Sequence, residues 1–331
     1  MADIALTQNL ADITSRATAL RRFTRSDAIF RVLTRSSAWI VLLVFLGIMV
    51  TLIISSWLAF SLFGFNFLTS SVWNPVTEKY GALPAIYGTL VSSAIAMVIA
   101  VPLGIGVAIF LTEICPRSLK RTIGIAIELL AGVPSIIYGI WGLFVFAPFF
   151  QTHIQQHVID TFANVPVLQD LFAGPPYGIG LFTAGIVLAI MILPFIASVT
   201  RDVFETVPPM LKEAAYGTGC TTWEVMWRIV LPFTQSGVVG GCMLALGRAL
   251  GETMAVTFVI GNAHRIDTSV FAPATTISAT IANEFAEALG DVYPSAIIAC
   301  GLILMGLTFT VLAAAQLMLR GFERRAGGRA S

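Results

Sequence analysis

Charged residues are scarce in this sequence of 331 residues. Asp, Glu, Lys and Arg together make up 11% of the chain, against about 25% in an ordinary soluble domain, whereas 57% of the residues are hydrophobic. A chain of this composition lacks the charged residues to cover a water-facing surface, which excludes a soluble globular protein. The net charge of +1 indicates little about partners, and we expect no nucleic-acid partner.

Patterns for catalysis and metal binding are also absent. The sequence contains no Gly-x-x-x-x-Gly-Lys-Ser/Thr loop, no plausible catalytic triad and no dinucleotide fingerprint, so we expect neither ATP hydrolysis nor another enzymatic activity from this chain alone. Its four cysteines are far apart and fit no metal or redox spacing. His153 and His157 have a spacing that suits zinc, but no third ligand follows, and we predict no metal site.

Long stretches without charge are abundant instead. A helix needs about 20 apolar residues to cross the roughly 30 Å hydrocarbon core of a bilayer. Six stretches satisfy this requirement, so we predict an all-α polytopic membrane protein with six transmembrane helices. The predicted spans are 38–64, 83–111, 123–150, 178–199, 233–262 and 294–318.

Lys and Arg are distributed unevenly between the connections. They gather before the first span, between the second and third, between the fourth and fifth, and after the sixth. The other connections contain only Lys79 and Arg265. Since cytoplasmic segments are rich in Lys and Arg, we predict that both termini are cytoplasmic. The predicted organisation is a basic cytoplasmic segment at residues 1–36, a transmembrane domain at 37–320 with a cytoplasmic loop at 201–232, and a basic cytoplasmic tail at 321–331.

Apolar residues in the N-terminal segment recur at roughly helical spacing with arginines between them. This pattern is compatible with a helix lying on the anionic inner leaflet. A disordered basic tail that serves only topology is an equal alternative for the first dozen residues.

A polar stretch at 212–232 interrupts the apolar second half of the chain. Small residues cluster in its first part and would give one helix an almost bare face. Thr221 and Glu224 then form the sequence pattern of a capping box. We predict two short helices with a tight turn at 217–219, the second ending before Pro232, that serve as a docking lever for another subunit.

Six residues of this stretch stand at the fixed positions of a known motif: Glu213, Ala214, Ala215, Gly219, Leu231 and Pro232. Their spacing resembles the EAA loop of ABC importer permeases. The resemblance implies a coupling helix that sits in a groove of a cytoplasmic ATPase. The alternative is a surface helical hairpin that contains Glu-Ala-Ala by accident.

The fifth predicted span contains two Gly-x-x-x-Gly patterns, at 237–241 and 247–251, and both have the spacing that brings bare backbone against a neighbouring helix. Arg248 stands inside the span, with Glu252 four residues later on the same helical face. An arginine there costs about 2.5–3.5 kcal/mol on insertion scales, so it should face protein or water. Two readings follow: a structural ion pair, or a cation in the path of a transported anion with Glu252 holding it in place.

The residues around this arginine also resemble a family signature. The stretches 246–256 (LGRALGETMAV) and 260–262 (IGN) are similar to the PstC-type permeases of phosphate-specific ABC importers, and SIIYG at 135–139 agrees with them. The sister PstA type shares the core of the signature and usually departs after it. The resemblance covers nearly the whole chain and implies the type I ABC importer permease fold, phosphate as the transported anion and alternating access.

The same resemblance implies the partners. These are a PstA-type second permease, two PstB-type subunits that bind ATP and Mg, and a PstS-type phosphate-binding protein outside the bacterial inner membrane. This chain itself would bind no cofactor. Alternatives within the class are a permease for another oxyanion, such as molybdate or phosphonate, or the sister PstA-type subunit. An ion-driven secondary carrier that uses Arg248 and Glu252 for coupling is the alternative from another class.

Overall fold

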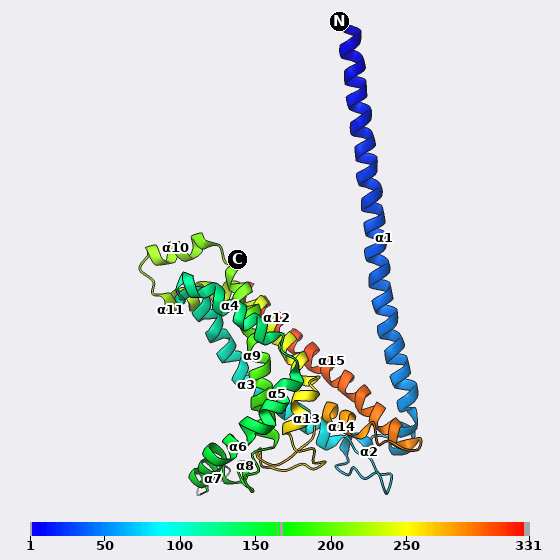
Figure 1. The fold of residues 1–331 in the computed structure, drawn as a ribbon, viewed down its shortest axis with the longest axis vertical. Helices are drawn as coiled ribbons and strands as arrows, with labels where there is room; N and C mark the ends of the chain where they lie inside the picture. Colours follow the sequence, from blue (N-terminus) through cyan, green and yellow to red (C-terminus); the bar gives the residue numbers. More distant parts are fainter. Residues whose placement is uncertain (1, 164, 166–167, 328–331) are drawn as a thin grey trace. The chain divides into compact units, whose positions relative to one another are not determined.

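The computed structural model describes residues 2–163, 165 and 168–327, and these residues form helices and loops without a β-strand (Figure 1). The last four residues of the predicted tail lie outside the described residues. The chain divides into two units, Met1–Ile54 and Ser55–Ser331. In the first unit, the apolar side chains of helix α1 (Ala2–Phe63) between residues 29 and 50 are largely exposed, as expected for a helix in lipid.

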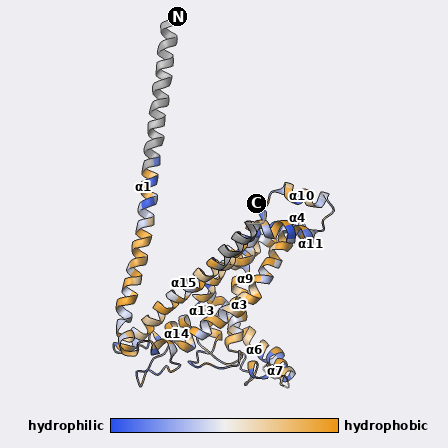
Figure 2. Cartoon of the chain, turned by 180° about the vertical axis from the view of Figure 1, so that it is seen from behind, coloured by the Kyte–Doolittle hydropathy of each residue, from blue (hydrophilic) through white to orange (hydrophobic). Residues whose placement is uncertain are grey.

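Six helices among the described residues are long and apolar enough to cross a membrane, which confirms the predicted number (Figure 2). These candidate spans are Ile29–Phe63, Leu83–Ile114, Ser135–Phe162, Leu181–Glu205, Thr222–Leu250 and Val292–Leu317. In the second unit they comprise α3 (Leu83–Ile109) with η1 (Phe110–Ile114); α5 (Ser135–Trp141), η2 (Gly142–Phe146), α6 (Ala147–Phe150), η3 (Gln151–Gln155) and α7 (Gln156–Phe162); α9 (Leu181–Glu205); α11 (Thr222–Val225), η4 (Met226–Val230) and α12 (Leu231–Leu250); and α15 (Val292–Gly327).

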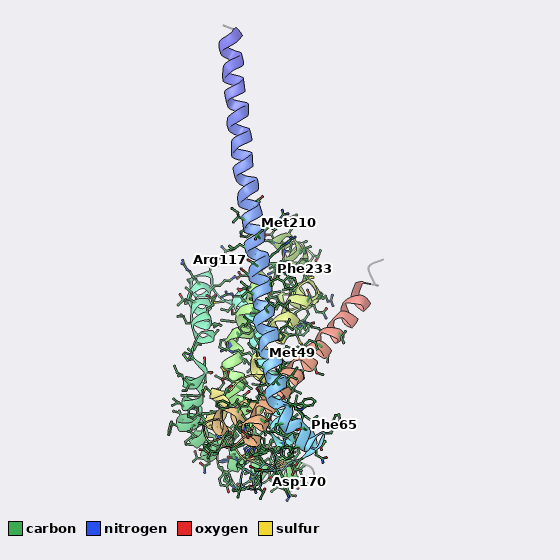
Figure 3. All side chains as sticks on the ribbon, turned by 90° about the vertical axis from the view of Figure 1, so that its right-hand side faces the viewer. Met49, Phe65, Arg117, Asp170, Met210 and Phe233 are labelled. Carbon is green, nitrogen blue, oxygen red and sulfur yellow. The ribbon has the colours of Figure 1, made fainter. Side chains whose placement is uncertain are left out.

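Short helices occupy the connections. They are α2 (Asn66–Thr69), α4 (Arg117–Ala131), α8 (Leu168–Leu171), α10 (Pro209–Gly217), α13 (Met254–Val259) and α14 (Ile277–Glu284). Within the second unit, Arg117 and Met210 lie at one end and Asp170 lies at the opposite end (Figure 3). We name these the α10 end, which contains α4, α10 and α11, and the α14 end, which contains α2, α7, α8 and α14.

The third span differs from the prediction. Residues 123–131 belong to α4, an amphipathic helix that ends at Gly132, and the span begins only at Ser135. Pro134 lies between the two helices with an extended backbone (φ −56°, ψ 134°), because a proline has no amide hydrogen to donate to the preceding turn. The predicted span 123–150 is therefore wrong at both ends.

The fifth span differs as well. Helix continues through Pro232, because the one-turn π-helix η4 immediately before it changes the hydrogen-bonding pattern at the place where the proline cannot donate. The predicted end before Pro232 is wrong. At its other end, α12 stops at Leu250, and residues 251–253 separate it from α13. The predicted span 233–262 is therefore interrupted.

The core of the second unit lies between α9 and its neighbours. A side-chain carbon placed on Gly237 or Gly241 of α12 would lie 2.6 or 2.8 Å from Val203 or Val199 of α9, so the first Gly-x-x-x-Gly pattern does bring two helices together. The second pattern does not. Gly247 makes only ordinary contact with Leu312, and Gly251 ends the helix.

Candidate functional site

The connection between the fourth and fifth spans folds as the two short helices α10 and α11 with a tight turn between them. Gly219 in this turn has a φ of 88°, in the left-handed region that favours glycine. Its amide donates a hydrogen bond to the carbonyl oxygen of Tyr216 over 3.0 Å. The predicted helix–turn–helix is therefore confirmed.

The start of α11 is fixed by the predicted capping box. The amide of Glu224 donates to Oγ1 of Thr221 over 3.4 Å, and the amide of Thr221 donates to Oε2 of Glu224 over 2.9 Å. Backbone amides at a helix N-terminus have no partner within the helix, so these two bonds stabilise the end of the turn.

The EAA residues do not share one face. Glu213 and Ala214 are exposed on α10, whereas Ala215 is 7% exposed and belongs to the hydrophobic core. The small residues therefore do not form the single exposed face that was predicted. Ala214 is exposed, whereas Ala215 packs into the core and holds α10 against the second unit. Around the exposed part, Met210 and Trp223 are 78% and 65% exposed. This is a large apolar surface for a polar loop.

The last two residues of the motif lie apart from the loop helices. Leu231 and Pro232 occupy the first turn of α12, after η4. The helix runs without interruption from Thr222 to Leu250, so α11 and α12 form one continuous helix.

An ion pair connects α10 to the second span. Nζ of Lys212 lies 2.6 Å from Oε1 of Glu113 in η1, and the two side chains are only 19% and 9% exposed. Sequence reasoning used Lys212 for orientation alone and missed this contact. The available signal was Glu113 itself, an isolated acid at the end of an apolar span.

The break after α12 contains the second group of predicted residues. Arg248 lies in the last turn of α12, and Glu252 lies in the three-residue interruption before α13. Oε1 of Glu252 accepts a hydrogen bond from the amide of Ala255 over 3.2 Å. The carboxylate therefore holds the start of α13. Because the helix is interrupted, the predicted ion pair between Glu252 and Arg248 is absent.

Arg248 itself is half-buried, and its guanidinium makes no hydrogen bond or ion pair with any residue that the structure describes. Its charge acts on the hydroxyl of Tyr138, in α5. That hydroxyl donates to the carbonyl oxygen of Leu130 across the break between α4 and α5, over 2.9 Å. Within the described chain, no ion pair supports the interpretation of Arg248 as a structural residue.

Helices α5 and α13, which follow the breaks at residues 132–134 and 251–253, meet beside this arginine. A side-chain carbon on Gly139 of α5 would lie 3.0 Å from both Cα of Ala255 and the carbonyl oxygen of Met254, so α5 and α13 approach at their backbones. Discontinuous helices of this kind place backbone and charged groups at binding sites in membrane transporters. The geometry gives an unpaired cation next to the contact between two broken helices.

Of the two histidines with the possible zinc spacing, His153 makes local side-chain contacts. His153 stacks on Phe149 at 4.8 Å and lies 2.7 Å from Oγ1 of Thr152. No group of three or more potential metal ligands occurs among the residues that the structure describes.

The sequence matches a family profile described as "Binding-protein-dependent transport system inner membrane component" over residues 100–324, which is more than half of the chain. The chain belongs to this permease family. The matched region contains both the α10–α11 loop and the break beside Arg248.

Similar proteins of known name refine the comparison. The permease is 65% identical over 313 residues to the phosphate transport system permease protein PstC of Mesorhizobium japonicum, which covers 95% of this chain and 96% of that protein. It is 56% identical to PstC of Pasteurella multocida, over 91% and 94% of the two chains. It is 41% identical to PstC 1 of Mycobacterium tuberculosis, over 82% of each chain. The resemblance to PstC-type permeases is confirmed.

Solved structures of lower identity share the fold. A chain of a bacterial alginate ABC transporter, in complex with a periplasmic protein bound to alginate pentasaccharide, matches 91% of the permease and 97% of its own length, with a TM-score of 0.59 and 17% identity. A chain of the inward-facing MetNI methionine ABC transporter matches 73% and 94%, with a TM-score of 0.52 and 18% identity. The predicted type I ABC importer permease fold is therefore confirmed.

Proposed function

We propose that the permease is the transmembrane subunit of an ATP-driven importer of inorganic phosphate. It is similar over nearly its whole length to permeases whose names specify phosphate transport. The observation that carries the proposal is the unpaired guanidinium of Arg248 beside two broken helices. A cation in this position is unfavourable in lipid, so it faces water or another chain, and arginine suits a tetrahedral oxyanion because its planar fork donates two hydrogen bonds at once.

The partners follow from the same proposal. A PstA-type permease forms the other half of the path, and a PstS-type protein delivers phosphate to the outer face. Two PstB-type subunits bind ATP and Mg at the cytoplasmic face, so this chain is not catalytic and binds no cofactor. The α10 end and both termini are cytoplasmic in a bacterial inner membrane, in agreement with the distribution of Lys and Arg.

Alternating access connects these parts. ATP closes the two ATPase subunits, and exposed Glu213 and Ala214 of α10 transmit the movement. One connection passes through η4 into α12, and the other passes through the Lys212–Glu113 ion pair into the second span. The path beside Arg248 then opens outward to receive phosphate, and hydrolysis returns it to the inward-open state. Glu252 contributes by holding the start of α13.

The test is phosphate uptake into vesicles that contain the complete four-component system, with ATP hydrolysis recorded in parallel. Arg248→Ala should reduce uptake by at least about tenfold while the complex still assembles, because charge-assisted hydrogen bonds to the anion are lost. Glu213→Ala should leave hydrolysis active and reduce the phosphate imported per ATP.

Arg35→Ala provides a matched control, because Arg35 is an exposed arginine of α1, outside both connections of α10. It should transport as the wild type does. Normal uptake by the Arg248→Ala variant would overturn the proposed path. Uptake of molybdate in competition with phosphate would show that the permease serves a different oxyanion.

A further inference from the structure

A charged pocket lies between α4 and α9 at the α10 end, away from the break beside Arg248. Its volume is about 390 Å³, within the range of pockets that bind small molecules. Six of the residues that line it are charged: Arg117, Lys120, Arg121, Arg201, Glu128 and Glu205. Neither the transport path nor the coupling loop uses this pocket.

The carboxylates of the pocket are already engaged. Arg201 contacts Glu128 at 2.6 Å and its neighbour Asp202 at 2.8 Å. Lys120 contacts Glu205 at 3.1 Å. These pairs connect α4 to α9, and each of the two pocket glutamates is already paired with one cation.

Arg117 and Arg121 are the remaining cations of the pocket. They lie one turn apart on α4, line the pocket and are exposed, and neither forms an ion pair with a residue that the structure describes. α4 begins at Arg117 without a side-chain cap, so the positive end of the helix dipole adds to their charge. The pocket therefore has an excess of positive charge at one end.

Gly124 shapes the floor between the two helices. A side-chain carbon on Gly124 would lie 2.6 Å from Nη1 of Arg201. Because Gly124 has no side chain, the guanidinium of Arg201 can lie directly over α4. It lines the same pocket as Arg117 and Arg121. Three guanidinium groups thus border one cavity, and planar guanidinium groups match the oxygens of a phosphate group.

The surroundings place this pocket at the membrane surface. It lies where the second and fourth spans end, and the other face of α4 exposes apolar residues, including Leu119 at 51% and Leu129 at 69%. Helices with this pattern lie in the interface, and basic pockets at the ends of spans bind lipid headgroups. We infer that the pocket between α4 and α9 binds a phosphate-bearing anion, either the headgroup of an anionic phospholipid or free inorganic phosphate.

The experiment compares two sources with the full-length permease. In the first arm, nanodiscs of phosphatidylcholine with or without phosphatidylglycerol and cardiolipin are used, and the lipids retained on purification are quantified by mass spectrometry. In the second arm, binding of radioactive inorganic phosphate is titrated in phosphatidylcholine nanodiscs. The Arg117→Gln/Arg121→Gln variant should bind the anion at least about tenfold more weakly, because two charge-assisted hydrogen-bond donors are lost.

The control variants distinguish binding in this pocket from a general attraction of the anion to positively charged protein. Arg31 and Arg35 of α1 are also exposed arginines four residues apart, so Arg31→Gln/Arg35→Gln removes the same charge elsewhere. This variant should bind normally, and Arg117→Lys/Arg121→Lys should recover most of the binding. Selective loss in the lipid arm identifies a headgroup, and selective loss in the phosphate arm, repeated in the Arg248→Ala background, identifies inorganic phosphate.

Equal loss in the two glutamine double variants would overturn the inference, and so would saturable binding in neither arm. These outcomes are independent of the transport proposal, which depends on Arg248 and on uptake rather than on binding to this pocket.

Discussion

The two ends of the second unit are held together by different interactions. The α14 end is closed by packed rings from three separate segments: Trp73 and Tyr80 before α3, His264 before α14, and Tyr293 in α15. The α10 end has buried apolar residues of its own, such as Phe204 and Met226, and three ion pairs also connect its helices: Lys212 with Glu113, Arg201 with Glu128, and Lys120 with Glu205. Buried rings contribute much to stability, whereas partly exposed ion pairs contribute little. The packed rings of the α14 end should therefore cost more free energy to separate than the exposed ion pairs of the α10 end.

The ring cluster also contains polar groups that bind one another. His264 stacks on Trp73 with centroids 5.1 Å apart, and its Nε2 lies 3.3 Å from Oε1 of Glu284. The hydroxyl of Tyr293 donates to the other oxygen of Glu284. Burial raises the pKa of Tyr80, and the nearby carboxylates of Glu78 and Glu284 raise it further. The cluster is therefore most stable with its aromatic groups neutral.

The largest effect should come from removing a buried ring at the α14 end. Phe67 is 0% exposed and packs between Phe60 at 5.8 Å and Phe63 at 6.2 Å. Phe67→Ala should lower the free energy of unfolding by about 3–5 kcal/mol, measured by denaturation of the detergent-solubilised permease. Phe65, two residues earlier, is 88% exposed, and Phe65→Ala should have an effect within about 0.5 kcal/mol. Equal effects of the two variants would contradict the account of the α14 end.

A smaller effect is expected for the best-buried ion pair of the α10 end. Lys212→Gln and Glu113→Gln should each destabilise the permease by about 1–3 kcal/mol, because each leaves a charge with little water and no partner. A double-mutant cycle should give a coupling free energy of about 0.5–3 kcal/mol. A coupling near zero would show that the 2.6 Å contact does not connect α10 to the second span.

The exposed pair of the same end should matter less. The side chains of Lys120 and Glu205 are 37% and 49% exposed, so their coupling in the corresponding cycle should be about 0.2–1 kcal/mol. It should decrease further as sodium chloride is added, since salt screens exposed charges. If this coupling matched that of Lys212 and Glu113, burial would not explain the difference between the two pairs.

The smallest effect concerns pH at the α14 end. Burial lowers the pKa of His264 below its ordinary value of 6.5, although the carboxylate of Glu284 opposes this shift. The folded protein therefore binds this proton less readily than the unfolded chain does. The contribution of neutral His264 to the free energy of unfolding is fully present above about pH 6.5. It is lost as the pH falls from 6.5 toward the lower pKa of His264 in the folded state.

The melting temperature of the wild type should therefore decrease between neutral and mildly acidic pH, and His264→Gln should decrease less over the same interval. Measurement by thermal denaturation at constant ionic strength tests this difference. Identical pH dependence in the two proteins would remove His264 as its source.

The features that follow local rules were predictable from sequence. The capping box of Thr221 and Glu224 and the turn at Gly219 depend on residues within one or two helical turns. The six apolar helices depend on composition alone. The first Gly-x-x-x-Gly pattern correctly predicted close helix packing, although the partner helix was not identified.

The interruptions of the third and fifth spans were not predictable from charge-free windows. Residues 132–134 carry no charge, and the charges of Arg248 and Glu252 were taken as isolated charges within one span, so charge-free windows did not mark either break. The position of Glu252 four residues after Arg248 indicated an ion pair only because the helix was taken as continuous. The contact between Lys212 and Glu113 joins residues 99 apart, which no local pattern specifies.

The two connections of α10 differ in a mechanical sense. The path through η4 into α12 is a covalent chain and cannot slip, whereas the Lys212–Glu113 pair can open and close again. In the proposed cycle, a movement of α10 therefore reaches the fifth span through a continuous backbone, and it reaches the second span through a contact that can break.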